Sequence, residues 1–138
     1  MDALAIEELQ VYLDRSPFIH FLALTVERVD AQAYELVLRM PMRRELERLL
    51  GTGQFHGGPI ASLIDIAGDF AVALSVRGPV PTINFRVDYL RPATGSYLRG
   101  IGRARRIGRT ICVADVEVLD EEGRLCAVGR GSYSSAPA

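Results

Sequence analysis

The sequence predicts an α+β fold, with one long apolar helix beside an antiparallel sheet. The first observation is an apolar segment at about residues 58–77, which at ~1.5 Å per residue would form a helix about 30 Å long. The second is the set of strand-like segments around it, two before and four after. A short helical segment precedes them all. A long apolar helix beside such strands is typical of the α+β class.

The amino-terminal part predicts one helix and two strands. Residues 3–14 carry a rough helical stripe, which Ser16-Pro17 ends, and residues 18–21 are expected to lead towards the sheet. Residues 22–30 and 33–41 predict strands joined by a turn near residues 30–32, and Pro41 stops the second. Alternation places one set of side chains of the second strand on the buried face: Tyr34, Leu36, Leu38 and Met40.

The central helix is expected from Gly58 to Arg77, after a short charged segment at residues 42–50 that suits a helical turn or a surface segment. Pro59 fits its first turn, where no intrahelical hydrogen bond is lost. Glycine inside a helix costs about 1 kcal/mol relative to alanine, so Gly68 is expected to have a packing reason.

The carboxyl-terminal half predicts four strands, at about residues 80–90, 96–107, 109–119 and 124–134. Residues 91–95 form a turn, and Gly108 and Gly123 break the later pairs. The 138 residues form one domain, residues 1–138.

Charge and composition narrow the partners and the compartment. The net charge of −1 gives no overall attraction to nucleic acid or to an anionic membrane. The amino terminus lacks the pattern of a signal peptide, and no stretch is expected to span a membrane, so the cytoplasm is the default location.

The two cysteines, Cys112 and Cys126, fall in the last two strands. Pairing Leu119 with Arg124 would place Cys112 opposite Gly131 and Cys126 opposite Glu117. A disulfide between them is therefore not expected, and without a nearby histidine they predict no zinc site. Buried free thiols are the interpretation that remains.

A carboxylate stands inside the apolar helix. Asp65 lies among Leu63, Ile64, Ile66 and Ala67, and an acid in such surroundings is costly unless it is bonded or used. Asp69 follows one turn later on about the same face and is expected to be solvated or ion-paired. The helix start offers free N–H groups and a positive dipole end, which Gly57 and Gly58 leave accessible to a ligand carbonyl.

Five short motifs occur in order along the chain: His56-Gly57-Gly58, Leu63-Ile64-Asp65, Thr82-Ile83-Asn84-Phe85, Tyr89-Leu90-Arg91-Pro92-Ala93 and Arg106-Ile107-Gly108-Arg109-Thr110. Together they resemble the motifs of hotdog-fold acyl-CoA thioesterases of the phenylacetic-acid-degradation type. The resemblance spans roughly residues 22–133. It implies a long central helix wrapped by a curved antiparallel β-sheet, and an active site at the interface of a homodimer, with dimers pairing into homotetramers.

The same resemblance implies roles for particular residues. Asp65 would act as general base or nucleophile, the Gly57 N–H would polarise the thioester carbonyl, and Thr82 would help to place water. His56 matches the motif histidine, for which a structural role is favoured over proton transfer. No metal and no cofactor are needed, because coenzyme A belongs to the substrate. Contacts to substrate or coenzyme A are implied for Gly58, Asn84, Arg91, Arg106, Gly108, Arg109 and Thr110.

One position departs from the family. An asparagine often stands six residues before the histidine, and this chain has Leu50 there. Gln54 is the candidate to supply the missing side-chain contact.

Geometry adds an argument for two chains. Gly58 and Asp65 are seven residues apart, or about 10 Å along a helix. A base must come within about 3 Å of the proton that it takes. Two antiparallel helices from two protomers could bring the glycine end of one to the aspartate of the other, which favours a dimer with shared sites.

A locally basic stretch is the second feature that suggests coenzyme A. Arginines outnumber acids between residues 86 and 109, and guanidinium groups suit phosphate. A solvated strand face is the alternative for any single arginine.

The predicted activity is hydrolysis of an aryl- or medium-chain acyl-CoA to the free acid and coenzyme A. Two alternatives remain open. The chain could bind acyl-CoA without hydrolysing it, as a sensor or regulator, or it could be a hotdog hydratase or dehydratase.

Overall fold

The computed structural model describes residues 6–136, which form one curved sheet around a central helix. The helices are α1 (Ile6–Arg15), α2 (Pro17–Leu22) and α3 (Gly57–Val76), with one 3-10 turn, η1 (Arg44–Leu46). The strands are β1 (Thr25–Asp30), β2 (Glu35–Pro41), β3 (Thr82–Tyr89), β4 (Tyr97–Ile107), β5 (Ile111–Asp120) and β6 (Leu125–Ser134). The predicted α+β class is confirmed.

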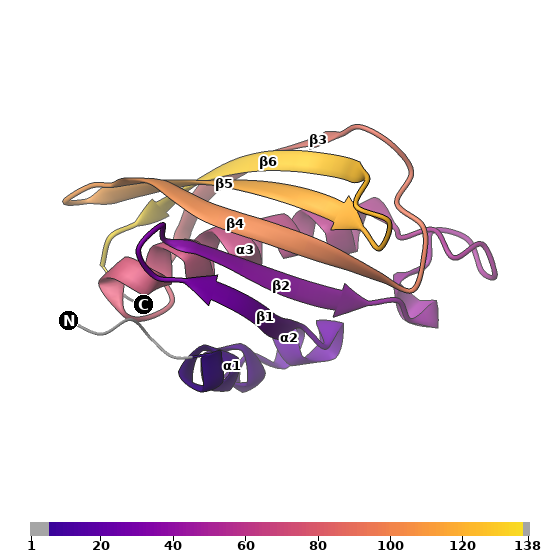
Figure 1. The fold of residues 1–138 in the computed structure, drawn as a ribbon, viewed down its shortest axis with the longest axis horizontal. Coiled ribbons are helices and arrows are strands. Elements are labelled where there is room, and N and C mark those ends of the chain that lie inside the picture. The colour runs from indigo at the N-terminus through magenta and orange to yellow at the C-terminus, as the bar shows by residue number, and fades with distance from the viewer. Residues whose placement is uncertain (1–5, 137–138) are drawn as a thin grey trace.

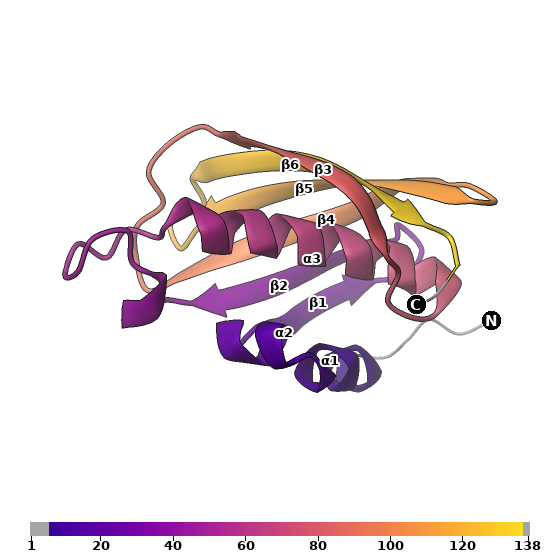
Figure 2. The same cartoon turned by 180° about the vertical axis from the view of Figure 1, so that it is seen from behind.

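The six strands form one antiparallel sheet in the order β1-β2-β4-β5-β6-β3. The strand that follows α3 in the chain, β3, therefore lies at an edge of the sheet. Figure 2 shows α3 lying along the concave face, with α1 and α2 near the β1 edge. This arrangement leaves β3 with one paired side, towards β6, and one open side.

The core lies between α3 and the concave face of the sheet. Leu63, Ile64 and Ala67 of α3 are fully buried, as are Leu38 of β2 and Val118 of β5. Two glycines of β4 allow the helix to approach closely. A Cβ on Gly100 would lie 2.8 Å from Leu63 Cγ, and one on Gly102 would lie 2.3 Å from the Ala67 carbonyl oxygen.

By length and composition alone, α3 could cross a membrane, contrary to the expectation from the sequence. Its 20 residues have a mean hydropathy of 1.6, and it is the one helix of the described residues to reach that level. Most of it is buried against the sheet. Its apolar character is therefore explained by its position in the core.

Near the amino terminus, residues 17–22 form a helix, whereas the sequence suggested only a lead into the sheet. Ser16 caps α2 by accepting a hydrogen bond from the Ile19 N–H at 3.2 Å, and Pro17 occupies its first position. Ala23 then ends the helix in the left-handed region, so β1 begins at Thr25 and not at residue 22. Residues 3–5 of the predicted first helix lie outside the described residues.

Two details of the strands also differ from the prediction. Tyr34 is not part of the buried face of β2, because it lies in the turn before the strand with φ +50°. The β5–β6 register is shifted, so Cys112 pairs with Tyr133 and Glu117 pairs with Val128. An irregularity next to Leu119 causes the shift, which a count from the turn could not show. Both cysteines are buried and free, as predicted.

Candidate active site

The Asp65 carboxylate and the Thr82 hydroxyl meet where α3 faces the edge strand. Asp65 lies near the middle of α3 and Thr82 begins β3. Thr82 Oγ1 donates a 2.7 Å hydrogen bond to Asp65 Oδ1. Burial raises the pKa of Asp65, and the bond from Thr82 acts in the opposite direction. The structure thus brings together two of the predicted catalytic residues.

Tyr133 of β6 contacts the backbone of Asp65, and the sequence did not identify this tyrosine as a site residue. Its hydroxyl donates to the backbone carbonyl oxygen of Asp65 at 3.0 Å, and the side chain is fully buried. A Cβ on Gly68 would lie 2.2 Å from this hydroxyl oxygen, and one on Gly131 would lie 2.5 Å from it. The packing reason expected for Gly68 is therefore confirmed. Gly68 was the one signal in the sequence that indicated a bulky side chain packed against this part of the helix.

The sequence suggested that Asp69 would be solvated or ion-paired, but its carboxylate instead bonds to the backbone. Its Oδ1 accepts a hydrogen bond from the backbone N–H of Val80 at 3.0 Å. Burial raises its pKa to about 7, and the nearby Asp65 charge acts in the same direction. Asp69 and Asp65 therefore form a pair of partly buried carboxylates one helical turn apart.

The glycine end of α3 offers one free N–H. His56 caps the helix, and its Nδ1 accepts the Gly58 N–H at 2.9 Å. The structural role favoured for His56 is thus present, and it occupies the Gly58 N–H. The Gly57 N–H has no hydrogen-bond acceptor among the described residues. Tyr89 donates its hydroxyl to the Gly57 carbonyl oxygen at 2.7 Å, which fixes this peptide.

A cavity of about 400 Å³ opens beside Gly57. Ile60, Tyr89 and Leu90 supply apolar lining, while Gln54 and Arg91 add polar groups. Leu50 lies in the preceding loop, is 71% exposed and does not line this cavity. Of the two positions considered for a side-chain contact, the structure therefore places Gln54, and not Leu50, next to Gly57.

The remaining candidates lie elsewhere in the chain. Arg106, Gly108, Arg109 and Thr110 surround the β4–β5 turn, at the opposite end of α3 from Gly57 (Figure 1). Asn84 pairs with Ser132, which alternates with the inward-facing Tyr133, so Asn84 faces away from α3. One chain therefore does not gather all the predicted contacts in one place.

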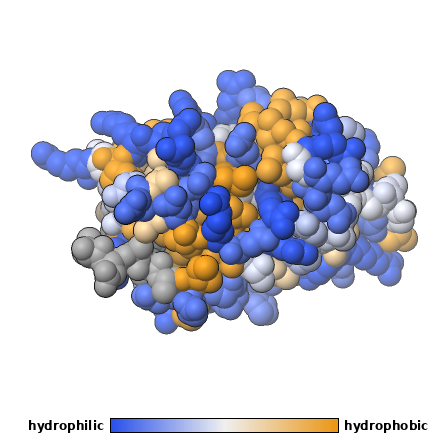
Figure 3. All heavy atoms as spheres, viewed as in Figure 1, coloured by the Kyte–Doolittle hydropathy of each residue, from blue (hydrophilic) through white to orange (hydrophobic). Residues whose placement is uncertain are grey.

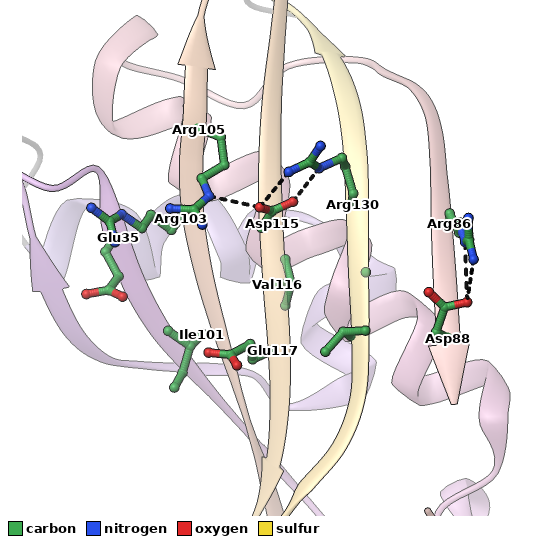
Figure 4. A pocket seen from close by; sticks show the side chains of 12 residues that line it. Glu35, Arg86, Asp88, Ile101, Arg103, Arg105, Asp115, Val116, Glu117 and Arg130 are labelled. Atoms are coloured by element: carbon green, nitrogen blue, oxygen red, sulfur yellow. Dashed lines mark hydrogen bonds and ion pairs between the residues drawn. The ribbon is translucent and has the colours of Figure 1, made fainter. Parts of the chain in front are cut away.

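The outer face of the sheet carries a second, larger hollow of about 590 Å³, shown in Figure 4. Asp115 bridges Arg105 at 2.9 Å and Arg130 at 2.6 Å within it. In Figure 3 this face shows hydrophilic and hydrophobic side chains side by side. None of the predicted site residues lines this hollow. The described residues also contain no cluster of three histidine, cysteine or acidic side chains that could hold a metal.

The architecture and the site define a class of protein. A long helix is enclosed by a curved six-stranded antiparallel sheet, and it carries a capped glycine turn at its start and an aspartate at its centre. This is the hotdog fold.

Comparison with known proteins gives the family. Residues 52–127 match the thioesterase superfamily, and the chain belongs to that family. A solved structure described as a protein from the thioesterase superfamily is 39% identical, with a TM-score of 0.87, and the match covers 94% of this chain and 96% of that one.

Two further relatives carry more specific names. A phenylacetic acid degradation-related protein from Ralstonia eutropha is 25% identical with a TM-score of 0.76, covering 89% of this chain and 98% of that chain. The medium/long-chain acyl-CoA thioesterase YigI of Escherichia coli is 26% identical over 142 residues, covering 90% of this chain and 88% of YigI. The resemblance to the phenylacetic-acid-degradation type is therefore confirmed.

Proposed function

We propose that this protein hydrolyses the thioester of an aryl- or medium-chain acyl-CoA, releasing the free acid and coenzyme A. The observation that carries the proposal is the Asp65 carboxylate, held in an apolar helix by the Thr82 hydroxyl at 2.7 Å. The name of the YigI relative supports acyl-CoA as the substrate. Its medium- and long-chain preference overlaps one of the two acyl classes proposed.

The chemistry needs a polarised carbonyl and an activated oxygen nucleophile. The thioester oxygen accepts the free Gly57 N–H, which stabilises the negative charge that develops there. As a base, Asp65 takes a proton from water, the water oxygen bonds to the acyl carbon, and the C–S bond breaks. The thiolate leaves with that proton. As a nucleophile, Asp65 would itself bond to the acyl carbon and release the thiolate, and water would then cleave the resulting anhydride.

The two halves of this chemistry lie on different parts of one rigid helix. Gly57 and Asp65 are eight residues apart in the uninterrupted α3, which is about 12 Å at ~1.5 Å per residue. Since one thioester carbonyl is far smaller than this, a single chain does not complete the site. We therefore infer that the protein is a homodimer in which each site takes Gly57 from one chain and Asp65 from the other.

The open side of β3 is the surface for this dimer. Ile83, Phe85 and Tyr89 of this edge strand are each 40% exposed or more. An unpaired strand edge with apolar side chains favours pairing with another chain. Antiparallel pairing of β3 with a second β3 sets the two α3 helices antiparallel across the two-fold axis. This arrangement brings Gly57 of one chain towards Asp65 of the other, as the chemistry requires.

Such a dimer also unites the groups proposed for coenzyme A. Arg91 lies beside Gly57, whereas the β4–β5 turn with Arg106, Arg109 and Thr110 lies at the other end of α3. Antiparallel helices bring the β4–β5 turn of the second copy towards the Gly57 end of the first. Guanidinium groups from two chains then face one bound nucleotide.

Pairing of two dimers into a homotetramer is supported by the outer face of the sheet. Four arginines and four carboxylates line its hollow, so this face is neutral and can pair with a copy of itself. The arginines are Arg86, Arg103, Arg105 and Arg130, and the acids are Glu35, Asp88, Asp115 and Glu117.

The decisive assay measures thiol release from a panel of aryl and aliphatic acyl-CoAs, including saturated chains. We expect release with the native chain and a large loss with Asp65→Asn, which keeps the shape of the side chain and removes the base. Full activity of Asp65→Asn would contradict the proposal. Tight acyl-CoA binding without thiol release across the panel would identify a binding protein instead. Hydration of an unsaturated acyl-CoA without thiol release would identify a hydratase.

A mixing experiment tests the shared site. Gly57→Pro removes the one N–H in question at a helix position that tolerates proline, and Asp65→Asn removes the carboxylate. Each variant alone is expected to be inactive. Because a mixed dimer holds one fully native site, refolding the two together is expected to restore about a quarter of native activity. No recovery in dimers shown to be mixed would mean that both groups act from the same chain.

A further inference from the structure

Asp69 is a partly buried acid that the proposed chemistry does not use. It lies between Gly68 and Phe70, both buried, and its carboxylate points to the turn that joins α3 to β3. Its partner is the backbone N–H of Val80, at 3.0 Å, and Val80 is 4% exposed. Placing an acid there costs free energy of folding, which its hydrogen bond to Val80 partly offsets.

The sequence of this turn makes the Val80 N–H unusual. Pro79 and Pro81 flank Val80, and proline has no N–H. Val80 is therefore the one residue of the Pro79–Pro81 segment that can donate a backbone hydrogen bond. Asp69 accepts this hydrogen bond. The Val80 N–H is thus the one backbone donor through which the Pro79–Pro81 segment can bond to α3.

The bonds on either side of Val80 show what the attachment positions. The Pro81 carbonyl oxygen accepts the Ser134 N–H of β6 at 2.9 Å. Thr82 follows directly, and its hydroxyl donates to Asp65 at 2.7 Å. Val80, Pro81 and Thr82 are thus each held by a hydrogen bond. Two of the three bonds go to carboxylates one turn apart on α3, and the third goes to β6.

We propose that Asp69 is a positioning residue for the candidate catalytic pair, fastening the Pro79–Pro81 segment to α3 so that the Thr82 hydroxyl stays on Asp65. The inference rests on the proposed function for its catalytic meaning. Its structural part concerns bonds that exist without substrate. Asp69 acts through Val80 and Thr82 and does not touch the substrate.

The charge of Asp69 interacts with Asp65 on α3 and with the Tyr133 hydroxyl of β6. Arg77 is the charged residue of the turn itself. Asp69 in its ionised form holds the Val80 N–H more strongly than in its neutral form, because a hydrogen bond to a charged acceptor is stronger.

Two variants separate the bond from the charge. Asp69→Ala removes the acceptor, whereas Asp69→Asn keeps an oxygen acceptor and removes the charge. With alanine we expect faster amide exchange at Val80 and a fall in kcat of about tenfold to a hundredfold, with KM nearly unchanged. With asparagine we expect both quantities to stay close to native at pH 6, where most of the Asp69 carboxyl is neutral. Asp30→Ala is the matched control, because Asp30 also accepts a backbone N–H, that of Ala33 at 3.2 Å, in an exposed turn after β1, which lies at the opposite edge of the sheet from β3.

The outcomes are distinct. Native Val80 exchange and native kcat in Asp69→Ala overturn the proposal, and so does an asparagine variant as impaired as the alanine variant. If the alanine chain does not fold, the native chain supplies the test. Its Val80 protection factor should rise between pH 6 and pH 8 and stay flat in Asp69→Asn, and a flat native profile overturns the proposal. Exchange needs no substrate, so a failure of thiol release would reject the proposed function without deciding this result.

Discussion

The hydroxyl of Tyr133 donates a 3.0 Å hydrogen bond to the backbone carbonyl oxygen of Asp65. The two residues are 68 positions apart in the chain, and the bond joins the last strand to the centre of α3. The bond fixes the position of α3 relative to β6 at the residue that carries the candidate catalytic carboxylate. The position of Asp65 is therefore set by the sheet as well as by the helix that carries it.

Removing this hydroxyl should weaken the fold slightly and the proposed activity with it. Tyr133→Phe keeps the ring packing and loses one buried hydrogen bond, for a cost of about 1 kcal/mol in the free energy of unfolding. Denaturant titration measures this cost. Tyr34→Phe, in the exposed turn before β2, is the control and should be neutral. A Tyr133→Phe chain as stable as native would show that the bond contributes nothing.

Gly68 and Tyr133 should be energetically coupled. A methyl group at position 68 would meet the Tyr133 hydroxyl oxygen at 2.2 Å and the ring carbon Cζ at 2.9 Å. We expect Gly68→Ala to destabilise by about 1–3 kcal/mol, despite the better helix propensity of alanine. In the double variant with Tyr133→Phe, loss of the hydroxyl relieves part of the overlap, so the combined cost should be less than the sum. Strict additivity would argue against direct contact.

Thr82 should tune the pH dependence of the proposed hydrolysis. Its bond to Asp65 lowers the pKa of that carboxyl, which burial raises. Thr82→Val removes the bond, so the pKa of Asp65 rises further and the acid limb of the kcat/KM profile should move to higher pH. Thr82→Ser keeps a hydroxyl and should leave the limb near its native position. A valine variant with an unmoved limb would mean that Asp65 is not the group that titrates.

Asp69 should make the native chain less stable as the pH rises. Its pKa is raised to about 7 in the folded chain, from 3.8 as the ordinary value. A raised folded pKa gives stability that is fully present below pH ~4 and is lost as the pH rises through ~7. Relative to native, Asp69→Asn should therefore gain on the order of 3 kcal/mol between these limits. Urea titrations at pH 5 and pH 8 measure this difference, with Asp30→Asn as control. A native-to-variant difference that is constant with pH would contradict it.

A charge on the open edge of β3 should separate the proposed dimer. Phe85 is 40% exposed on that edge, and an arginine there would be desolvated in a paired interface. We expect Phe85→Arg to sediment as a monomer with native circular dichroism, and to lose thioesterase activity. Val11→Arg, on the exposed side of α1, should leave sedimentation and activity unchanged. A native chain that is itself monomeric would reject the dimer proposal.

Much of the fold could be predicted because it depends on local patterns. The alternation of Leu36, Leu38 and Met40 identified β2, and the glycine turn followed by an apolar run identified α3. The lack of a disulfide was correct even though the assumed β5–β6 register was wrong, since the two cysteines are far from opposite in either register. The helix at residues 17–22 was missed because a serine followed by proline both ends one helix and begins another.

The sequence by itself determined the set of elements, the capped glycine end of α3 and the presence of an acid in its apolar centre, because each depends on neighbouring residues. Only the tertiary structure decided which groups meet that acid. The Thr82–Asp65 bond spans 17 residues, the Tyr133–Asp65 bond spans 68, and Asp69 reaches Val80 across the turn. Such contacts follow from sheet order and register, which the packing of the whole core against α3 fixes and no local pattern encodes.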